Sequence, residues 1–257
     1  MLRLLKSVSV ICALAALISV TISCGSGGSA QLRVVDALSN NTNNTPLDIY
    51  VNNVLINSTA LSYSNVFPSQ PNSGPATYVG VPGGSASIDI YNSPQSTSPP
   101  ENPIFKTAIS ETLTGGDQYT LVLAGSYQDS FPGKQPTAFL FTDTNIAPAS
   151  GNIVLHIIDA SVNTPAGGFS IYIYQSSGGI PATPQITGLM LGNLVTYSPA
   201  WVANTSYAVT VAYPTGTQFY SYYLPSPNNQ QITTLVIQDL QSGNTVEAQP
   251  IVMTDLN

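Results

Sequence analysis

The fold is decided by the stretch LRVVDA at Leu32–Ala37, because nearly the same run of residues returns as LHIIDA at Leu155–Ala160. The segment that follows also returns, as LDIY at Leu47–Tyr50 and FSIY at Phe169–Tyr172. The copies lie about 120 residues apart, which indicates tandem domains, since solenoid repeats are only about 20 to 50 residues long. The chain therefore contains two related units.

The closing segments of the two units match as well. YTLVL at Tyr119–Leu123 is echoed by TTLVI at Thr233–Ile237, and FTDTN at Phe141–Asn145 by MTDLN at Met253–Asn257. Each unit is long enough to fold around its own hydrophobic core. We therefore expect a first domain over residues 31–145, a linker over 146–152 and a second domain over 153–257.

Apolar residues recur with a period of two in both units. Leu47, Ile49 and Val51 alternate with other residues in the first unit, and Val209 and Val211 repeat the pattern in the second. Such alternation indicates half-buried strands, and clusters of Pro, Gly and Asn separate the runs. The predicted fold class is all-β, with two tandem antiparallel β-sandwich domains of an immunoglobulin-like or transthyretin-like kind.

The N-terminus has the pattern of an export signal. Arg3 and Lys6 precede an apolar run over Val8–Val20, and the small Ser23 stands before Cys24. This run is too short for an ordinary membrane span and is typical of a signal peptide. We expect a signal peptide over residues 1–23, lipidation at Cys24 as in bacterial lipoproteins, and a flexible tether over 24–30.

The charge of the chain limits the classes of partner that it can bind. Removing that signal leaves three basic residues against twelve carboxylates. This balance argues against nucleic acid, whose binding depends on neutralising phosphates. It also leaves the acyl anchor at Cys24 as the only attachment to a membrane. We expect a location in the bacterial cell envelope, with the outer membrane or cell surface favoured.

Four segments of the first unit carry a resemblance to a known family. They are RVVDA at Arg33–Ala37, PLDIYV at Pro46–Val51, YTLVLAG at Tyr119–Gly125 and TDTN at Thr142–Asn145. Together they resemble the bacterial envelope family called domain of unknown function 4397. The resemblance covers both units and implies two tandem copies of an exported β-sandwich module. It implies no activity.

The chain has one histidine, His156, at the position that Arg33 holds in the first unit. A nucleophile needs a base beside it, so this residue is the natural candidate for catalysis. Its place between Leu155 and Ile157 instead predicts a polar side chain on the outer, solvent-facing side of a strand. We expect no catalytic residue.

Metal binding receives little support. One histidine and no partner cysteine do not supply the ligands that a zinc site needs, so we expect no metal and no cofactor. Calcium needs only carboxylates and carbonyls, and Asp36 and Asp159 recur in the two units. Turn capping is favoured for these two residues, and calcium remains open.

The stretch FYSYYL at Phe219–Leu224 has the composition of a recognition surface. On a strand, Tyr220 and Tyr222 share one face, and Tyr172 and Tyr174 are predicted to face outward on another strand. These four tyrosines form a candidate ligand platform, because flat rings suit sugars and proteins. The alternative is that tyrosine simply favours strands and covers apolar neighbours.

Three hypotheses for function remain. The first is a non-enzymatic cell-envelope lipoprotein that serves adhesion, scaffolding or ligand capture at the surface, with an envelope protein or a glycan as partner. The second is a glycan-binding module that uses exposed tyrosines. The third is an envelope hydrolase with a dispersed site. Tandem modules favour the first two, because duplication raises the effective concentration for repeated ligands.

Overall fold

The computed structural model describes residues 28–39, 45–70, 75–93, 98–104, 109–127, 134–202, 204–239 and 250–256. The predicted signal peptide and Cys24 lie outside these residues. All regular elements within them are β-strands. The same ranges contain no helix with the length and apolar composition that a membrane span requires.

The first half of the chain forms two sheets. The inner sheet has the order β4-β1-β8-β9, and β5 also pairs with β1; its strands are β1 (Ser29–Asp36), β4 (Val66–Phe67), β5 (Val79–Pro82), β8 (Gln118–Ala124) and β9 (Thr137–Thr142). The outer sheet has the order β3-β2-β6-β7; its strands are β2 (Leu47–Val51), β3 (Val54–Leu55), β6 (Gly84–Asn92) and β7 (Ile109–Leu113).

The second half repeats this strand order. Its inner sheet has the order β13-β10-β16-β17 and consists of β10 (Val154–Asp159), β13 (Leu194–Tyr197), β16 (Ile232–Ile237) and β17 (Ile251–Leu256). Its outer sheet has the order β12-β11-β14-β15 and consists of β11 (Phe169–Gln175), β12 (Ile186–Leu189), β14 (Tyr207–Ala212) and β15 (Gln218–Leu224).

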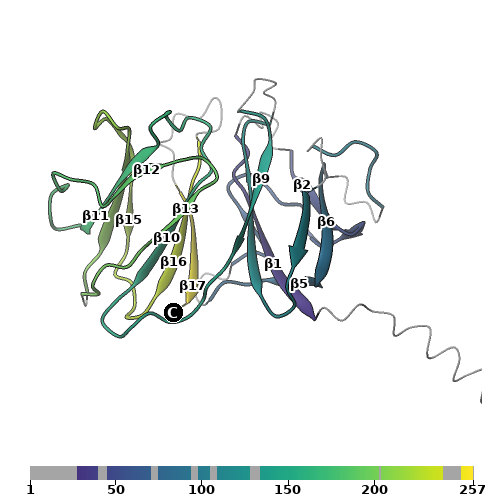
Figure 1. The fold of residues 1–257 in the computed structure, drawn as a ribbon, viewed down its shortest axis with the longest axis horizontal. Coiled ribbons are helices and arrows are strands. Elements are labelled where there is room, and N and C mark those ends of the chain that lie inside the picture. Colours follow the sequence, from purple (N-terminus) through teal and green to yellow (C-terminus); the bar gives the residue numbers. More distant parts are fainter. Residues whose placement is uncertain are drawn as a thin grey trace, which may run out of the picture.

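The four sheets stand in a row, with the two inner sheets facing each other (Figure 1). Each half has its own core between its inner and outer sheets, around Leu32 and Ile49 in the first half and Leu155 and Ile171 in the second. The all-β prediction and the β-sandwich architecture are confirmed.

One strand pair in each half differs from the antiparallel arrangement expected from the sequence. β1 runs parallel to β8, with Val35 opposite Val122, and β10 runs parallel to β16, with Ile158 opposite Val236. Parallel strands are typically buried on both faces and carry apolar residues at successive positions. The apolar runs on these four strands fit that rule. They are Val34–Val35 and Leu121–Leu123 in the first half, and Ile157–Ile158 and Leu235–Ile237 in the second.

The second face of each inner sheet is buried by the opposite half. Along β1, Leu32 and Val34 point into the first sandwich, whereas Val35 points at the other half. The residues between the halves form a third cluster, here called the interdomain core, made of Val35, Ala37, Val122, Ala124, Ile158, Ala160, Val236, Ile251 and Met253. The two sandwiches therefore share an apolar interface.

Corresponding positions of the two halves meet in this interface. Val35 and Ile158 come from the repeated segments that open the two units, and both are buried in the interdomain core. At the border of the core, an ideal Cβ atom added to Gly192 would lie 2.3 Å from the Phe139 ring. Gly192 has φ +79°, a conformation that favours glycine, so this position also lets the second half approach the first closely.

Candidate functional site

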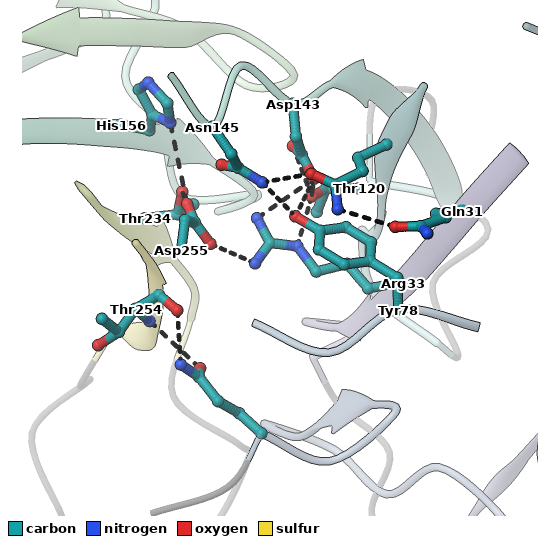
Figure 2. Close-up of polar contacts among 12 residues, drawn as sticks. Gln31, Arg33, Tyr78, Thr120, Asp143, Asn145, His156, Thr234, Thr254 and Asp255 are labelled. Carbon is teal, nitrogen blue, oxygen red and sulfur yellow. Dashed lines mark hydrogen bonds and ion pairs between the residues drawn. The ribbon is translucent and has the colours of Figure 1, made fainter. Parts of the chain in front are cut away.

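A group of polar side chains lies beside the interdomain core, here called the charge cluster: Arg33, Asp143, Asp255 and His156 (Figure 2). Arg33 lies on β1 and Asp143 directly follows β9, whereas His156 lies on β10 and Asp255 on β17. The period of two along each strand turns these side chains to the face opposite the sandwich core. The cluster thus joins the two halves.

Arg33 is the centre of the cluster and is only 1% exposed. Its Nη1 donates to Asp255 Oδ1 of the second half, and its Nη2 lies 3.4 Å from Asp143 Oδ2 of the first half. Its Nε donates to Thr120 Oγ1 over 2.6 Å, and its guanidinium carbon lies 5.2 Å from the centre of the Tyr78 ring. One cation therefore binds carboxylates of both halves.

The carboxylates have further donors within their own halves. The hydroxyls of Thr120 and Tyr78 donate to Asp143 Oδ2 over 2.6 and 2.8 Å, and the hydroxyl of Thr234 donates to Asp255 Oδ2. Thr120 and Thr234 hold corresponding positions on β8 and β16. A threonine and an aspartate thus recur in each half, and a shared arginine connects the two pairs.

The sequence-based placement of Arg33 and His156 on a solvent-facing surface is wrong. Arg33 is buried, and the side chain of His156 is 12% exposed with its Nδ1 3.9 Å from Asp255 Oδ2. The strand face was assigned correctly as the one opposite the sandwich core, but the other half of the chain covers it. A single strand cannot indicate what packs on its second face.

Burial governs the protonation of the cluster. Burial on its own lowers the pKa of Arg33, but the carboxylates of Asp255 and Asp143 outweigh it and raise the pKa above the ordinary value, so the guanidinium stays charged. Burial raises the pKa of Asp143, although Arg33 opposes this change. Burial also lowers the pKa of His156, which therefore is neutral at pH 7.

A hollow of about 330 Å³ borders the cluster, with His156, Asp143 and Thr196 among its lining residues. His156 and Asp255 are too far apart for a hydrogen bond, and Asp255 is already bound by Arg33 and Thr234. A histidine that serves as a base is normally oriented by such a bond. The arrangement holds the halves together and offers no prepared nucleophile and base.

The recurring aspartates at the strand ends bind turn backbone. Asp36 Oδ1 accepts from the N–H of Leu38 over 3.0 Å, and Asp159 Oδ1 accepts from the N–H of Ser161 over 2.9 Å. Asp159 Oδ2 also accepts from Thr164. These contacts are turn caps, and the described residues contain no group of three histidine, cysteine or acidic residues placed to hold a metal ion.

Asp36 predicts a specific pH dependence of stability. Its Oδ2 has no hydrogen-bond partner among the described residues, and burial raises its pKa from 3.8 to about 7. A carboxyl group whose pKa is raised by folding stabilises the fold fully below the unfolded pKa, and this contribution is lost as pH rises through the folded pKa. The free energy of unfolding should therefore fall between about pH 4 and pH 7.

The variant Asp36→Asn isolates this effect. Urea unfolding at pH 4.5 and at pH 8 should show a clearly smaller pH dependence in the variant than in the natural chain. Asp159, whose pKa burial also raises to about 7, still contributes the same trend in both proteins. An identical change in unfolding free energy for the two proteins would contradict the burial of Asp36 as an acid.

The structure separates the four predicted platform tyrosines. Tyr220 is 2% exposed and belongs to the core of the second sandwich, so its predicted place on an exposed platform is wrong. Tyr222 is half-buried and packs against the same core. Tyr172 and Tyr174 are partly exposed on β11, on the opposite face of the outer sheet. Sequence alternation alone left the choice of face on β15 open.

The open face of the second outer sheet carries a different tyrosine, Tyr223, which is 61% exposed. Ala208 on β14 lies in register with both Tyr174 and Tyr223, and Thr210 lies in register with both Tyr172 and Ser221. We call Tyr172, Tyr174 and Tyr223 the tyrosine face. The YY pair at 222 and 223 was the signal for it, because neighbouring residues on a strand must point to opposite faces.

A row of hydroxyl groups lies beneath these rings. Tyr174 Oη is 3.2 Å from Thr210 Oγ1, which is 2.6 Å from Ser221 Oγ. Thr210 itself is buried and contacts both the Tyr174 hydroxyl and the Ser221 hydroxyl. The tyrosine face therefore combines flat aromatic surface with fixed polar groups and has no charged side chain among the residues named.

Comparison with known proteins gives a family. The profile named Domain of unknown function (DUF4397) matches residues 30–166, which run from β1 through β10. The chain belongs to the DUF4397 family. The match includes both the Arg33–Asp143 pair of the first half and His156 of the second. The sequence has no match among curated proteins.

Solved structures give only distant likenesses to this DUF4397 chain. The CBM26 module CBMbc of Eubacterium rectale Amy13K, in complex with maltoheptaose, is 12% identical, with 86% of this chain and 98% of that chain covered and a TM-score of 0.23. A streptococcal virulence factor described for α-glucan binding is 12% identical, with coverages of 82% and 93% and a TM-score of 0.26. The Bacillus anthracis TIE protein is 10% identical, with coverages of 82% and 51% and a TM-score of 0.25. Likenesses at this level carry no argument about function.

Proposed function

We propose that this chain is a non-enzymatic, glycan-binding lipoprotein of the bacterial cell envelope, built from two copies of the DUF4397 domain. This proposal takes the second sequence hypothesis as the specific form of the broader adhesion and ligand-capture role. The observation that supports this proposal is the tyrosine face, where Tyr223 is 61% exposed beside Tyr172 and Tyr174 on an open sheet. Sugar rings stack on exposed aromatic side chains, while hydroxyl groups fix their orientation.

The ionisable side chains have structural roles, which supports a function without catalysis. Arg33, Asp143 and Asp255 bind one another between the halves, and the single histidine borders that contact. Asp36 and Asp159 cap turns. Glu101 and Glu111 are exposed on the first half.

The strand order supports the second copy. In both halves the opening strand pairs in parallel with the penultimate strand, and the closing strand completes the inner sheet. Threonine and aspartate recur at corresponding places next to Arg33. A family domain over the first half and a second copy over the remainder account for this repetition.

Glycan binding is tested with Tyr223→Ala. Isothermal titration of the soluble chain with neutral glucose and N-acetylglucosamine hexasaccharides should give binding that weakens about tenfold in the variant, since loss of a stacked ring removes about 1.4 kcal/mol. Tyr223→Phe keeps the ring and should bind nearly as well as the natural chain. Binding that is unaffected by Tyr223→Ala would remove the tyrosine face as the site.

Membrane attachment is tested at Cys24. The preceding signal pattern and the lack of another cysteine after residue 24 support lipidation there. In bacteria that express the full chain, Cys24→Ser should move the protein from the membrane fraction to the soluble fraction. Mass spectrometry of the N-terminal peptide supplies the direct check. An unmodified natural peptide that still fractionates with membranes would contradict the acyl anchor.

A further inference from the structure

A groove follows the boundary between the two halves beside residues 58–70. The groove is a hollow of about 420 Å³; a neighbouring hollow of about 390 Å³, lined by first-half residues alone, shares Asn65, Val66 and Ser69 with it. One wall is the segment from Ser64 to Gln70 of the first half. The other wall is formed by β17 and by Tyr222 of β15 in the second half.

Contacts between the halves fix both walls. The side-chain amide of Gln70 donates to the carbonyl oxygen of Thr254 over 2.8 Å and accepts from the Thr254 N–H over 3.2 Å. Gln238 Nε2 donates to Ser64 Oγ over 2.8 Å, and the Tyr63 hydroxyl donates to the carbonyl of Asp239. The groove is thus formed before a ligand arrives, which limits the ordering entropy that binding costs.

The lining of the groove is polar and uncharged. None of the residues that line the two hollows carries a charge, although the chain as a whole has a formal charge of −7. In the hollow between the halves, hydroxyl and amide side chains are the majority: Ser64, Asn65, Ser69, Gln70 and Tyr222 line it together with Val66, Pro250, Ile251 and Val252. Aromatic surface comes from Tyr222, and burial raises the pKa of Tyr222, so its hydroxyl remains a donor.

This lining favours a neutral polyhydroxylated ligand over an extended peptide. A peptide would have to add a strand to the free edge of β17, using several backbone groups in succession. Gln70 already occupies the outward N–H and C=O of Thr254, and Pro250 has no N–H to offer. Because outward groups alternate along a strand, only Val252 remains between them.

We propose that this interdomain groove is a second carbohydrate site, which takes a short neutral oligosaccharide whose ring stacks on Tyr222 and whose hydroxyls bind the serine and amide side chains. The groove proposal rests on the proposed function for its ligand class, whereas its residues are different. Since each wall comes from a different half, the site exists only while the two sandwiches are docked. Two sites on one chain would also strengthen binding to a repeating glycan.

Adjacent tyrosines give a matched test, because Tyr222 faces the groove and Tyr223 faces outward. The full soluble chain is titrated with neutral glucose and N-acetylglucosamine hexasaccharides, and with a neutral serine-rich heptapeptide as the competing class. Tyr222→Ala should weaken oligosaccharide binding about tenfold at one of two sites. Ser69→Trp fills the groove from an exposed position and should abolish that site, whereas Ser69→Ala removes only one hydroxyl and should weaken binding less than Tyr222→Ala does.

The outcomes separate the two proposals. If Ser69→Trp removes one oligosaccharide site and Tyr223→Ala removes another, both the groove and the tyrosine face are supported. Loss with Tyr223→Ala alone overturns the groove and leaves the tyrosine face standing. Loss with the groove variants alone overturns the tyrosine face as a site and leaves the groove standing. Binding of the heptapeptide at the groove, or no oligosaccharide binding at millimolar concentration, overturns the groove proposal. Ser69→Trp retains the core contacts of Tyr222, so a folding defect in Tyr222→Ala does not prevent a decision.

Discussion

Replacing Arg33 with methionine should destabilise the folded chain by about 3 to 5 kcal/mol, the range observed when one partner of a buried ion pair is removed. Arg33 is 1% exposed, and the substitution leaves Asp143 and Asp255 buried beside each other without their shared cation. Urea unfolding followed by circular dichroism measures the loss. A methionine of similar length retains much of the packing, so the effect reports mainly on charge.

Two further variants provide the control. In the background of Arg33→Met, changing Asp143 and Asp255 to asparagine removes the unpaired charges and should restore a large part of the lost stability. Arg33→Lys keeps a positive charge but cannot bind both carboxylates with a planar fork, and should fall between the natural chain and Arg33→Met. A loss below about 1 kcal/mol for Arg33→Met, as for an exposed pair, would contradict the burial of this contact.

Separating the halves should have the second large effect. A chain that ends after Asn145 keeps the first sandwich core but exposes Val35, Ala37, Val122 and Ala124, all fully buried in the intact protein. It also loses Asp255 as a partner of Arg33. We expect β-type circular dichroism, a melting temperature lower by at least about 10 °C, and self-association through the uncovered face.

Size-exclusion chromatography and thermal melting of residues 28–145 check this expectation. The matched variant places a charge on the uncovered face, as in Val122→Lys, which should restore a monomer without restoring the melting temperature. A monomeric half that melts within a few degrees of the intact chain would mean that the interdomain core contributes little.

The strands were readable from the sequence because their cause is local. The alternation at Leu47, Ile49 and Val51 follows from the one face that packs in the sandwich core, and the structure has β2 over Leu47–Val51. The repeated segments LRVVDA and LHIIDA also occupy corresponding strands, β1 and β10.

The interface could not be read from the same pattern. Arg33 and His156 stand on faces that alternation marks as opposite the core, and nothing local indicates that another domain covers such a face. A partial signal was present in Val34–Val35 and Leu121–Leu123, where apolar residues occupy both faces of one strand. Such runs indicate burial on both sides and also favour parallel pairing, in place of the antiparallel pairing that the alternation alone predicts.

The tyrosines illustrate a second limit. Tyr220, Tyr222 and Tyr223 are the same residue type on one strand, and propensity cannot determine which of them the core will take. The register with β14 decides it, because Val211 opposite Tyr220 and Val209 opposite Tyr222 both point into the core. Tyr223 then remains for the outer face.

Calorimetry of the intact chain from residue 28 to 257 tests most directly whether the two sandwiches form one cooperative body. The interdomain core and the Arg33 contacts to Asp143 and Asp255 join the halves, so we predict a single transition. Its calorimetric enthalpy should equal the van't Hoff enthalpy, and Arg33→Met should lower its temperature without splitting it. Two well-separated transitions in the natural chain, each matching one isolated half, would contradict the docked arrangement and with it the groove that depends on both halves.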